Sequence, residues 1–505
     1  MQQLSEHDAA FLASDSAHAN ANVTLLHIYD QSTAPAGKVR FKTILAHIES
    51  RLGAAPVFRR RLMQLPLGLD RPYWTDDEHF DLEYHVRHIA LPKPGDWRQF
   101  CIQVSRIHAR PLDLNRPLWE IYVIEGLDSF LDLPEGSFAL LTKTHHAALD
   151  LEHDGELITR LHDLSPDTGA APPPAPWFPE NPPALLPLLA RGMLRNLTSP
   201  RRLVGPLSRR LLKLAPSQLM LARERLLTGA DMPLVRFNAV VSPHRVFETR
   251  RFAIDEFKRI RSLVHGATLH DAVLAVCGGA LHRYLDHHCE LPSASLYAMA
   301  PLSVRPDGDS ADATPGLSWL RVALGTELDD PVQRLRSIQA QTAASATMDR
   351  AVGAREQAEA APQGPAAMLS RMARLATRTL AGERTPLAAC SITSVPGPQA
   401  PLYLCGARMS YFSAMLPIAD GLGLAFAVTS YDGRIIISPT SCRELMPDPE
   451  RFAQCLRDSF QELLALAPVD AALGPTTKRP RTAAPKPRGT PSASKRPRAR
   501  AQPAT

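Results

Sequence analysis

The residues best suited to chemistry are two adjacent histidines and a nearby aspartate, in the segment His145-His146-Ala-Ala-Leu-Asp150. Because His146 and Asp150 stand four positions apart, they share a face if the intervening turn is helical. A histidine has an unperturbed pKa of about 6.5, so neutral His146 can accept a proton from an alcohol and return it to a departing thiolate. Asp150 either fixes the histidine tautomer or holds the loop through an arginine. His146, His145 and Asp150 are therefore the candidate catalytic residues.

Two other interpretations of this segment stay open. A histidine pair can fall in a loop by chance in a chain with 18 histidines. Alternatively, a metal ion could recruit loosely spaced ligands from this region. Those ligands would be His145, His146, Asp150, His153 and Asp154. The sequence has no Gly-x-Ser-x-Gly turn, no Gly-x-x-x-x-Gly-Lys loop and no His-Glu-x-x-His pair. The acid–base interpretation is therefore favoured, and no metal or cofactor is predicted.

The elements that position these residues belong to the first half of the chain. Residues 1–165 are predicted to form a mixed α/β subdomain, with a helix at 41–52 and strands at 118–126 and 138–144. The second of these strands leads directly into the histidines. Asp, Ser, Pro and Gly between the two strands favour a turn, so the strands should be antiparallel neighbours.

A linker and a second α/β subdomain follow. Residues 166–240 are rich in proline and then, from Leu185 to Leu227, alternate leucine with arginine and lysine. This basic amphipathic pattern is typical of helices that cross between two subdomains, and also of helices that lie on an anionic membrane. Residues 241–475 should form the second subdomain. Its predicted elements are a helix at 268–287, strands at 296–301, 423–430 and 435–438, and a helical segment at 339–385.

Length and charge restrict the class of protein. A chain of 505 residues is long enough for two hydrophobic cores. No stretch approaches the roughly 20 apolar residues of a membrane-spanning helix, and the N-terminus lacks a secretory signal, so a cytoplasmic location is expected. Of the net charge of +6, nine positive charges and no negative ones lie in Lys478–Thr505, which leaves −3 for the preceding residues. Residues 476–505 should be a disordered basic tail, and no specific nucleic-acid binding is predicted.

Many further blocks of the chain, spread in order from about Leu4 to about Phe460, carry a family resemblance. They are Leu4–Leu12, Phe80–His88, Leu91–Gly95, Arg110–Glu120 with its Pro-Leu-Trp, the histidine segment, Asp271–Leu285, Pro301–Arg305, Val395–Pro398, Leu402–Arg408 and Ser430–Gly433. In these blocks the chain resembles the bacterial wax ester synthase/acyl-CoA:diacylglycerol acyltransferase family.

The resemblance implies an α/β fold of two chloramphenicol-acetyltransferase-like subdomains, the CoA-dependent acyltransferase fold, joined by the proline-rich linker and crossover helices. It implies an O-acyltransferase that moves a fatty acyl group from acyl-CoA to diacylglycerol, to a long-chain alcohol, or to both. His146 would be the general base, and Asp150 would be structural, held by an arginine from 59–61 or by Arg305. Such an enzyme would work peripherally at a membrane or lipid-inclusion surface. Trp119 is a weak candidate for lining the acyl tunnel, with core packing favoured.

Four positions depart from the family pattern. Leu151 follows Asp150 where the family has glycine, His270 replaces the asparagine of an Asn-Asp pair, and Ser394 and Leu317 each replace an asparagine. Leu151 matters most, because glycine is the residue that tolerates any backbone conformation. A degenerate relative that binds lipid surfaces without turnover is therefore the alternative. A condensation domain that acts on carrier-bound substrates is a third candidate, against which the Pro-Leu-Trp and Val-Pro-Gly-Pro blocks argue.

Overall fold

The strand that leads into the histidine pair is the centre of the first sheet. It is β7 (Phe138–His145), and all eight of its residues are buried. It pairs antiparallel with β6 (Trp119–Glu125) on one side and with β2 (Asn22–Asp30) on the other. The predicted antiparallel strand pair is therefore confirmed, and the predicted first helix is α2 (Phe41–Arg51). The sequence analysis did not predict β2.

This computed structural model describes most of the chain outside the linker and the C-terminal tail. The described residues are 2–4, 9, 11–12, 15–54, 56–65, 70–127, 129, 133–134, 136–148, 161–167, 177–180, 187–188, 232–304, 316–351, 388–398 and 400–468. Apart from residues 187–188, the predicted amphipathic segment at 185–227 lies outside them. So do the predicted helical residues beyond 351 and the whole predicted tail.

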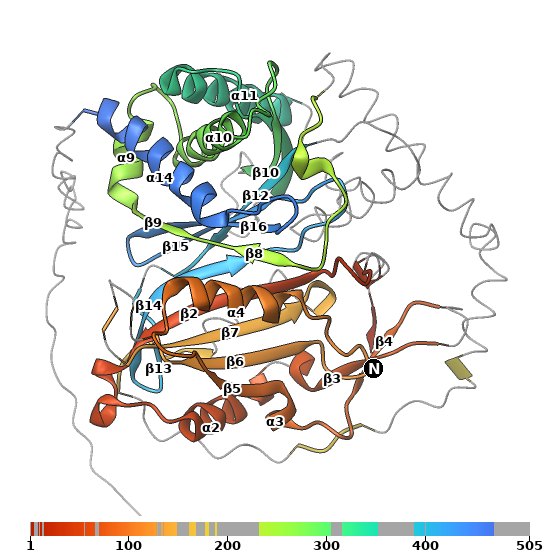
Figure 1. Ribbon diagram of the computed structural model, residues 1–505. Coiled ribbons are helices and arrows are strands. Elements are labelled where there is room, and N and C mark those ends of the chain that lie inside the picture. Colours follow the sequence, from red (N-terminus) through yellow and green to blue (C-terminus); the bar gives the residue numbers. More distant parts are fainter. Residues whose placement is uncertain are drawn as a thin grey trace, which may run out of the picture. The chain divides into compact units, whose positions relative to one another are not determined.

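The first sheet has six strands in the order β13-β14-β2-β7-β6-β5 (Figure 1). Its remaining members are β13 (Tyr403–Leu404), β14 (Ala407–Met415) and β5 (Val86–Ala90). Because β13 and β14 come from the second half of the chain, that half completes the sheet that holds the histidine pair. α2 packs its apolar side chains on one face of the sheet. α4 (Trp97–Ala109) packs on the opposite face.

The second half builds a larger sheet in the order β11-β10-β12-β15-β16-β8, and β9 also pairs with β16. Its strands are β8 (Arg245–Phe247), β9 (Arg250–Ala253), β10 (Tyr297–Val304), β11 (Gly316–Ala323), β12 (Cys390–Pro396), β15 (Ala425–Tyr431) and β16 (Arg434–Cys442). The predicted strands near 296, 423 and 435 are therefore present as β10, β15 and β16. β14 reaches this sheet through side chains: Thr429 Oγ1 donates to the Phe412 carbonyl at 2.6 Å, and Ser413 Oγ lies 2.7 Å from Ser438 Oγ.

Four helices pack against the larger sheet around its apolar core. They are α9 (Ile254–Arg261), α10 (Leu269–His287), α11 (Pro331–Ala351) and α14 (Pro449–Leu466). α10 is the predicted long helix, and α11 covers the beginning of the predicted helical segment. A Cβ on Gly279 would lie 2.2 Å from Ser459 Oγ, so glycine permits the close approach of α10 and α14.

A third, small sheet lies beside the histidine segment. It has the order β1-β4-β3, from Gln2–Gln3, Tyr73–Asp76 and Arg60–Met63. The described residues up to Ala467 belong to one compact unit. Among the described residues, no helix is long and apolar enough to cross a membrane.

Candidate active site

The end of β7 fixes the backbone of both histidines. The His145 amide donates to the Leu118 carbonyl and the His146 amide donates to the Ala21 carbonyl, each at 2.9 Å. The strand then turns at once into one 3-10 turn, His146–Ala148. Both histidines are 1% exposed. The pair therefore lies inside the protein, at the strand end that the sequence predicted.

The ring of His145 makes two hydrogen bonds. Its Nδ1 accepts the backbone N–H of Ala147 at 3.1 Å, so this nitrogen carries no proton. Its Nε2 lies 3.1 Å from Oδ2 of Asp15, to which it donates. The other oxygen of Asp15 accepts the Ala21 N–H at 2.9 Å. Because both ring nitrogens are engaged, His145 is a poor metal ligand in this arrangement.

The N-terminal segment also covers His146. Phe11 stacks on the His146 ring with 3.9 Å between centroids and 27° between planes. Ala148, at the end of the turn, packs with Leu4, Leu62 and Trp74. The sequence analysis identified residues 4–12 only as a family block and missed Asp15. No spacing rule could have found this contact, because 130 residues separate Asp15 from His145.

The rest of the predicted motif lies outside the described residues. This holds for Asp150, Leu151, His153, Asp154 and Arg305. The other arginines proposed to hold Asp150 have partners elsewhere, as follows. Arg60 lies 3.6 Å from Asp76, Arg61 lies 3.8 Å from Asp77, and Arg59 lies over the Trp177 ring at 4.9 Å. Among the described residues, no group of three or more His, Cys, Asp or Glu side chains could hold a metal ion.

Trp119 is part of the hydrophobic core. It is 1% exposed, and its Nε1–H donates to the Phe58 carbonyl at 2.9 Å. His85 stacks on the ring at 4.5 Å and bonds through Nδ1 to the Trp119 carbonyl at 2.7 Å. These contacts give the indole a packing role among α2, α3 (Leu82–His85) and the first sheet.

A buried charge cluster joins the Pro-Leu-Trp block to β7. Lys143, two residues before His145, lies 3.6 Å from Glu120 Oε2 and also donates to the Arg110 carbonyl. Burial lowers the pKa of Lys143 to about 8, against the opposing effect of Glu120. Tyr122 donates to Glu120 at 2.9 Å, and burial together with this carboxylate raises the Tyr122 pKa to about 12. The cluster fixes the register of β6 and β7 where the histidines emerge.

The His270-Asp271 pair begins α10. Asp271 is buried and accepts from the Thr268 amide at 2.7 Å and the Thr268 hydroxyl at 2.8 Å. Its other oxygen accepts from Thr342 of α11 at 2.8 Å. Burial lowers the pKa of His270. Asp271 is thus the N3 residue of the capping box that begins at Thr268, and it also joins two helices, which gives an aspartate at this position a structural role.

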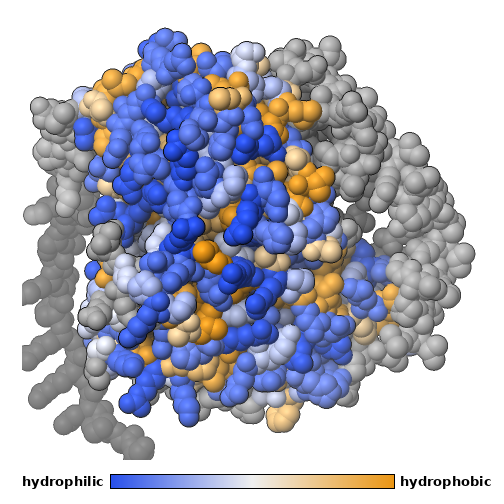
Figure 2. Space-filling view, in the orientation of Figure 1, coloured by the Kyte–Doolittle hydropathy of each residue, from blue (hydrophilic) through white to orange (hydrophobic). Residues whose placement is uncertain are grey.

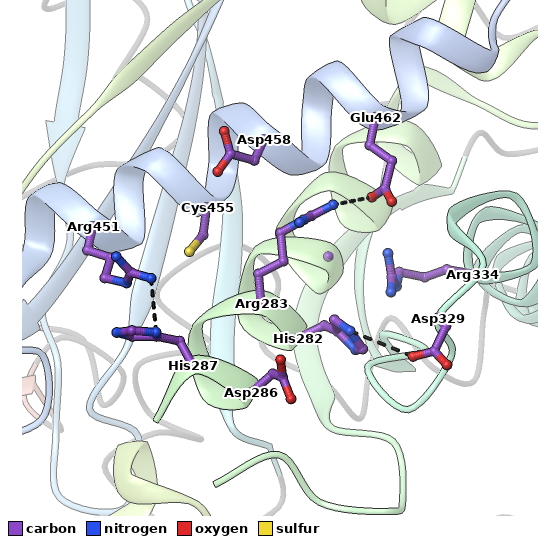
Figure 3. Close-up of a pocket in the computed structure, with 11 residues that line it drawn as sticks. His282, Arg283, Asp286, His287, Asp329, Arg334, Arg451, Cys455, Asp458 and Glu462 are labelled. Carbon is purple, nitrogen blue, oxygen red and sulfur yellow. Dashed lines mark hydrogen bonds and ion pairs between the residues drawn. The ribbon is translucent and has the colours of Figure 1, made fainter. Parts of the chain in front are cut away.

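A cavity of about 330 Å³ lies at α10 and α14 but contains neither histidine of the motif (Figure 3). Three of its contacts are between polar side chains: Arg283 with Glu462 at 2.8 Å, Arg451 with His287 at 2.9 Å, and His282 with Asp329 at 3.8 Å. A lining of this polarity does not suit an acyl chain, because hydrocarbon would displace the water that solvates these charged groups. The cavity is therefore separate from the candidate active site.

Comparisons with known proteins identify the family to which the chain belongs. Residues 4–273 match the wax ester synthase/diacylglycerol acyltransferase catalytic domain, and residues 316–464 match the C-terminal domain of the same family. A protein of Mycobacterium tuberculosis (strain CDC 1551) named as a diacylglycerol O-acyltransferase is 31% identical over 466 residues, covering 92% of this chain and 90% of the relative. The chain belongs to the wax ester synthase/diacylglycerol acyltransferase family and is an acyltransferase.

Solved structures support the same conclusion for the fold. The wax ester synthase/diacylglycerol acyltransferase from Marinobacter aquaeolei VT8 matches with a TM-score of 0.68 and 25% identity, over 92% of this chain and 99% of that chain. The starter condensation domain of rhizomide synthetase matches with a TM-score of 0.52 and 13% identity, over 93% and 96%, and thus shares the fold. The predicted two-subdomain acyltransferase fold is therefore confirmed.

Proposed function

We propose that this acyltransferase moves a fatty acyl group from acyl-CoA to the hydroxyl of diacylglycerol, of a long-chain alcohol, or of both, with His146 as the general base. The observation that carries the proposal is the position of His146. It is buried at the end of a central strand, on a turn held by backbone hydrogen bonds, in a chain of this family. Its neighbour His145 has both ring nitrogens engaged, so proton transfer falls to His146.

The reaction needs one proton to move twice. Neutral His146 takes the proton of the acceptor hydroxyl while that oxygen attacks the thioester carbonyl carbon. The tetrahedral intermediate then collapses, the C–S bond breaks, and the protonated imidazole returns the proton to the CoA thiolate. The products are an ester and free CoA. This route requires no covalent acyl-enzyme. Asp150 takes no part in these proton transfers and supports the segment.

The direct test incubates the full-length protein with palmitoyl-CoA and either hexadecanol or dioleoylglycerol. Thiol release and the ester product are both measured. Replacement of His146 by alanine should lower kcat by about 10²- to 10⁴-fold, the usual contribution of general acid–base catalysis. His88→Ala is the matched control, because His88 lies on β5 and contacts Glu125. Folded wild-type protein that releases no CoA in response to either acceptor would refute the proposal and leave the non-catalytic alternative.

We further propose that the enzyme works at a lipid surface in the cytoplasm. Both candidate acceptors are membrane-soluble, and the basic amphipathic sequence of residues 185–227 suits an anionic surface. Figure 2 shows a face that is covered mostly by hydrophilic residues, with small apolar patches between them. Support for a lipid surface therefore comes from residues 185–227 and not from this face. Liposome flotation with and without residues 185–227 tests it. Equal flotation of both proteins would assign the segment to crossover helices only.

A further inference from the structure

Asp15 uses both of its carboxylate oxygens beside the histidine pair. Oδ1 accepts the Ala21 N–H at 2.9 Å, and Oδ2 accepts from Nε2 of His145 at 3.1 Å. The carbonyl of the same Ala21 accepts the His146 amide at 2.9 Å. One side chain of the N-terminal segment is therefore tied to the backbone and to a ring of the motif.

His145 is in turn hydrogen-bonded to the turn that carries His146. The Ala147 N–H points at Nδ1 of His145 at 3.1 Å, so the ring caps the 3-10 turn in the manner of an N-cap side chain. A neutral imidazole has one proton, and with Nδ1 accepting, that proton must be on Nε2. Nε2 is the nitrogen that faces Asp15.

We propose that Asp15 is a positioning residue, which keeps His145 in the Nε2–H tautomer and thereby holds the turn that presents His146 to substrate. In the opposite tautomer a proton on Nδ1 would face the Ala147 N–H, and a buried donor would lose its acceptor. The proposal rests on the proposed function in one respect only, namely that His146 is the base. Its structural part can be tested without any activity.

The variant Asp15→Asn tests whether Asp15 acts through its hydrogen bonds or only by filling space. Asp15→Asn keeps the size and shape of the side chain but has one acceptor and one donor. Whichever way the amide turns, its NH₂ faces either the Ala21 N–H or Nε2 of His145. In the second orientation Nε2 must accept, which places the proton on Nδ1. The variant should lose about 10- to 100-fold in kcat, in line with a lost hydrogen bond to a charged group, while KM for palmitoyl-CoA changes little.

Asp420 supplies a matched control. Its Oδ2 lies 3.1 Å from Nε2 of His18, and its Oδ1 accepts the Val241 N–H at 2.9 Å. Asp420→Asn therefore breaks the same pair of contacts at a histidine outside the motif, and its kcat should stay near that of wild type. Asp15→Glu, which keeps two acceptors, should retain more activity than Asp15→Asn. Wild-type kcat in Asp15→Asn would overturn the proposal.

A double-mutant cycle shows whether Asp15 acts through His145. In His145→Asn, the amide oxygen can still accept the Ala147 N–H but has no tautomer to set. Adding Asp15→Asn to this background should cost much less than in wild type, which would be a clear coupling. An equal loss in both backgrounds would mean that Asp15 acts independently of His145, and the proposal would fall.

Nitrogen-15 NMR of histidine-labelled protein reads the tautomer directly. The His145 signals are assigned by their loss in His145→Asn. Wild type should show a protonated Nε2 and an unprotonated Nδ1, whether or not the protein turns over acyl-CoA. A protonated Nδ1 in wild type would refute the proposal even if Asp15→Asn failed to fold. An inactive wild type with the expected tautomer would refute the proposed function and leave this positioning role intact.

Discussion

At the residue scale, the two adjacent histidines make different contacts. His145 donates to Asp15 and accepts from Ala147, so it serves as a cap. His146 stacks on Phe11 and lies at the start of the turn. We therefore assign them different roles, a cap at His145 and the proposed base at His146. The family resemblance points to His146 as the base, but no local pattern predicts that Asp15 engages His145.

Trp119 is expected to contribute stability rather than substrate choice. Trp119→Phe removes the Nε1–H bond to the Phe58 carbonyl and part of a buried ring. The free energy of unfolding should fall by about 1–3 kcal/mol, as measured by urea denaturation. The acyl-chain preference, tested with acyl-CoA substrates of different lengths, should not change. A changed preference with unaltered stability would place the indole on the acyl path.

At the element scale, the C-terminal end of α4 lies beside the histidine strand. Its last carbonyls would be orphaned, but three side chains donate to them. Asn20 donates to the Ala109 carbonyl at 3.0 Å, while Asn22 at 3.1 Å and Lys143 both donate to Arg110. Asn22 pairs with His145 in the sheet. The helix end therefore supports the point from which the motif leaves β7.

Acid should destabilise the packing of α4 against the first sheet through His108. This residue lies near the end of α4, with its ring 2.8 Å from Thr24 Oγ1. Burial lowers its pKa well below the ordinary value of 6.5, and the positive charges of Arg245 and Lys143 lower it further. Below about pH 6.5, His108 binds more protons in the unfolded chain than in the folded protein. The free energy of unfolding therefore falls as the pH falls.

The measurement is urea denaturation of wild type and His108→Gln at several values between about pH 5 and pH 7. The variant should show a shallower loss of stability over this range. The expectation fails if the His108 variant and wild type lose stability equally with acid.

The strands next to the motif were predictable because they are short apolar runs with a turn between them. α4 carries a local signal that the sequence analysis did not use, since Asp96 and Gln99 form a capping box at its start. β14 has no comparable signal. Its partner β2 lies about 380 residues earlier in the chain, and only the folded sheet brings Phe412 opposite His27. Long-range pairing of this kind cannot be inferred from local patterns.

At the whole-molecule scale, β14 joins the two halves of the chain within one compact unit. It pairs with β2 of the first half over its length and bonds by side chains to β15 and β16 of the second. Phe412, on β14, is fully buried and stacks on His27 at 5.2 Å. Residues of the second half therefore contribute to the hydrophobic cores on both faces of the first sheet as well as to their own.

Phe412→Ala should consequently destabilise both halves together. Removal of a buried phenylalanine costs about 3–5 kcal/mol. Hydrogen exchange of β6 amides reports on the first half, and hydrogen exchange of α10 amides reports on the second. Both probes should show one transition at the same lower urea concentration. Two separated transitions would show that the halves unfold independently.

The shared strand also has a consequence during synthesis on the ribosome. β2 and β7 leave the ribosome early, but β14 follows about 260 residues after β7, a delay on the order of tens of seconds at ordinary elongation rates. Until then β2 is the outer strand of the first sheet, with an unpaired backbone edge of the kind that recruits other chains. The newborn first half should therefore depend on chaperones until the second half supplies its strand.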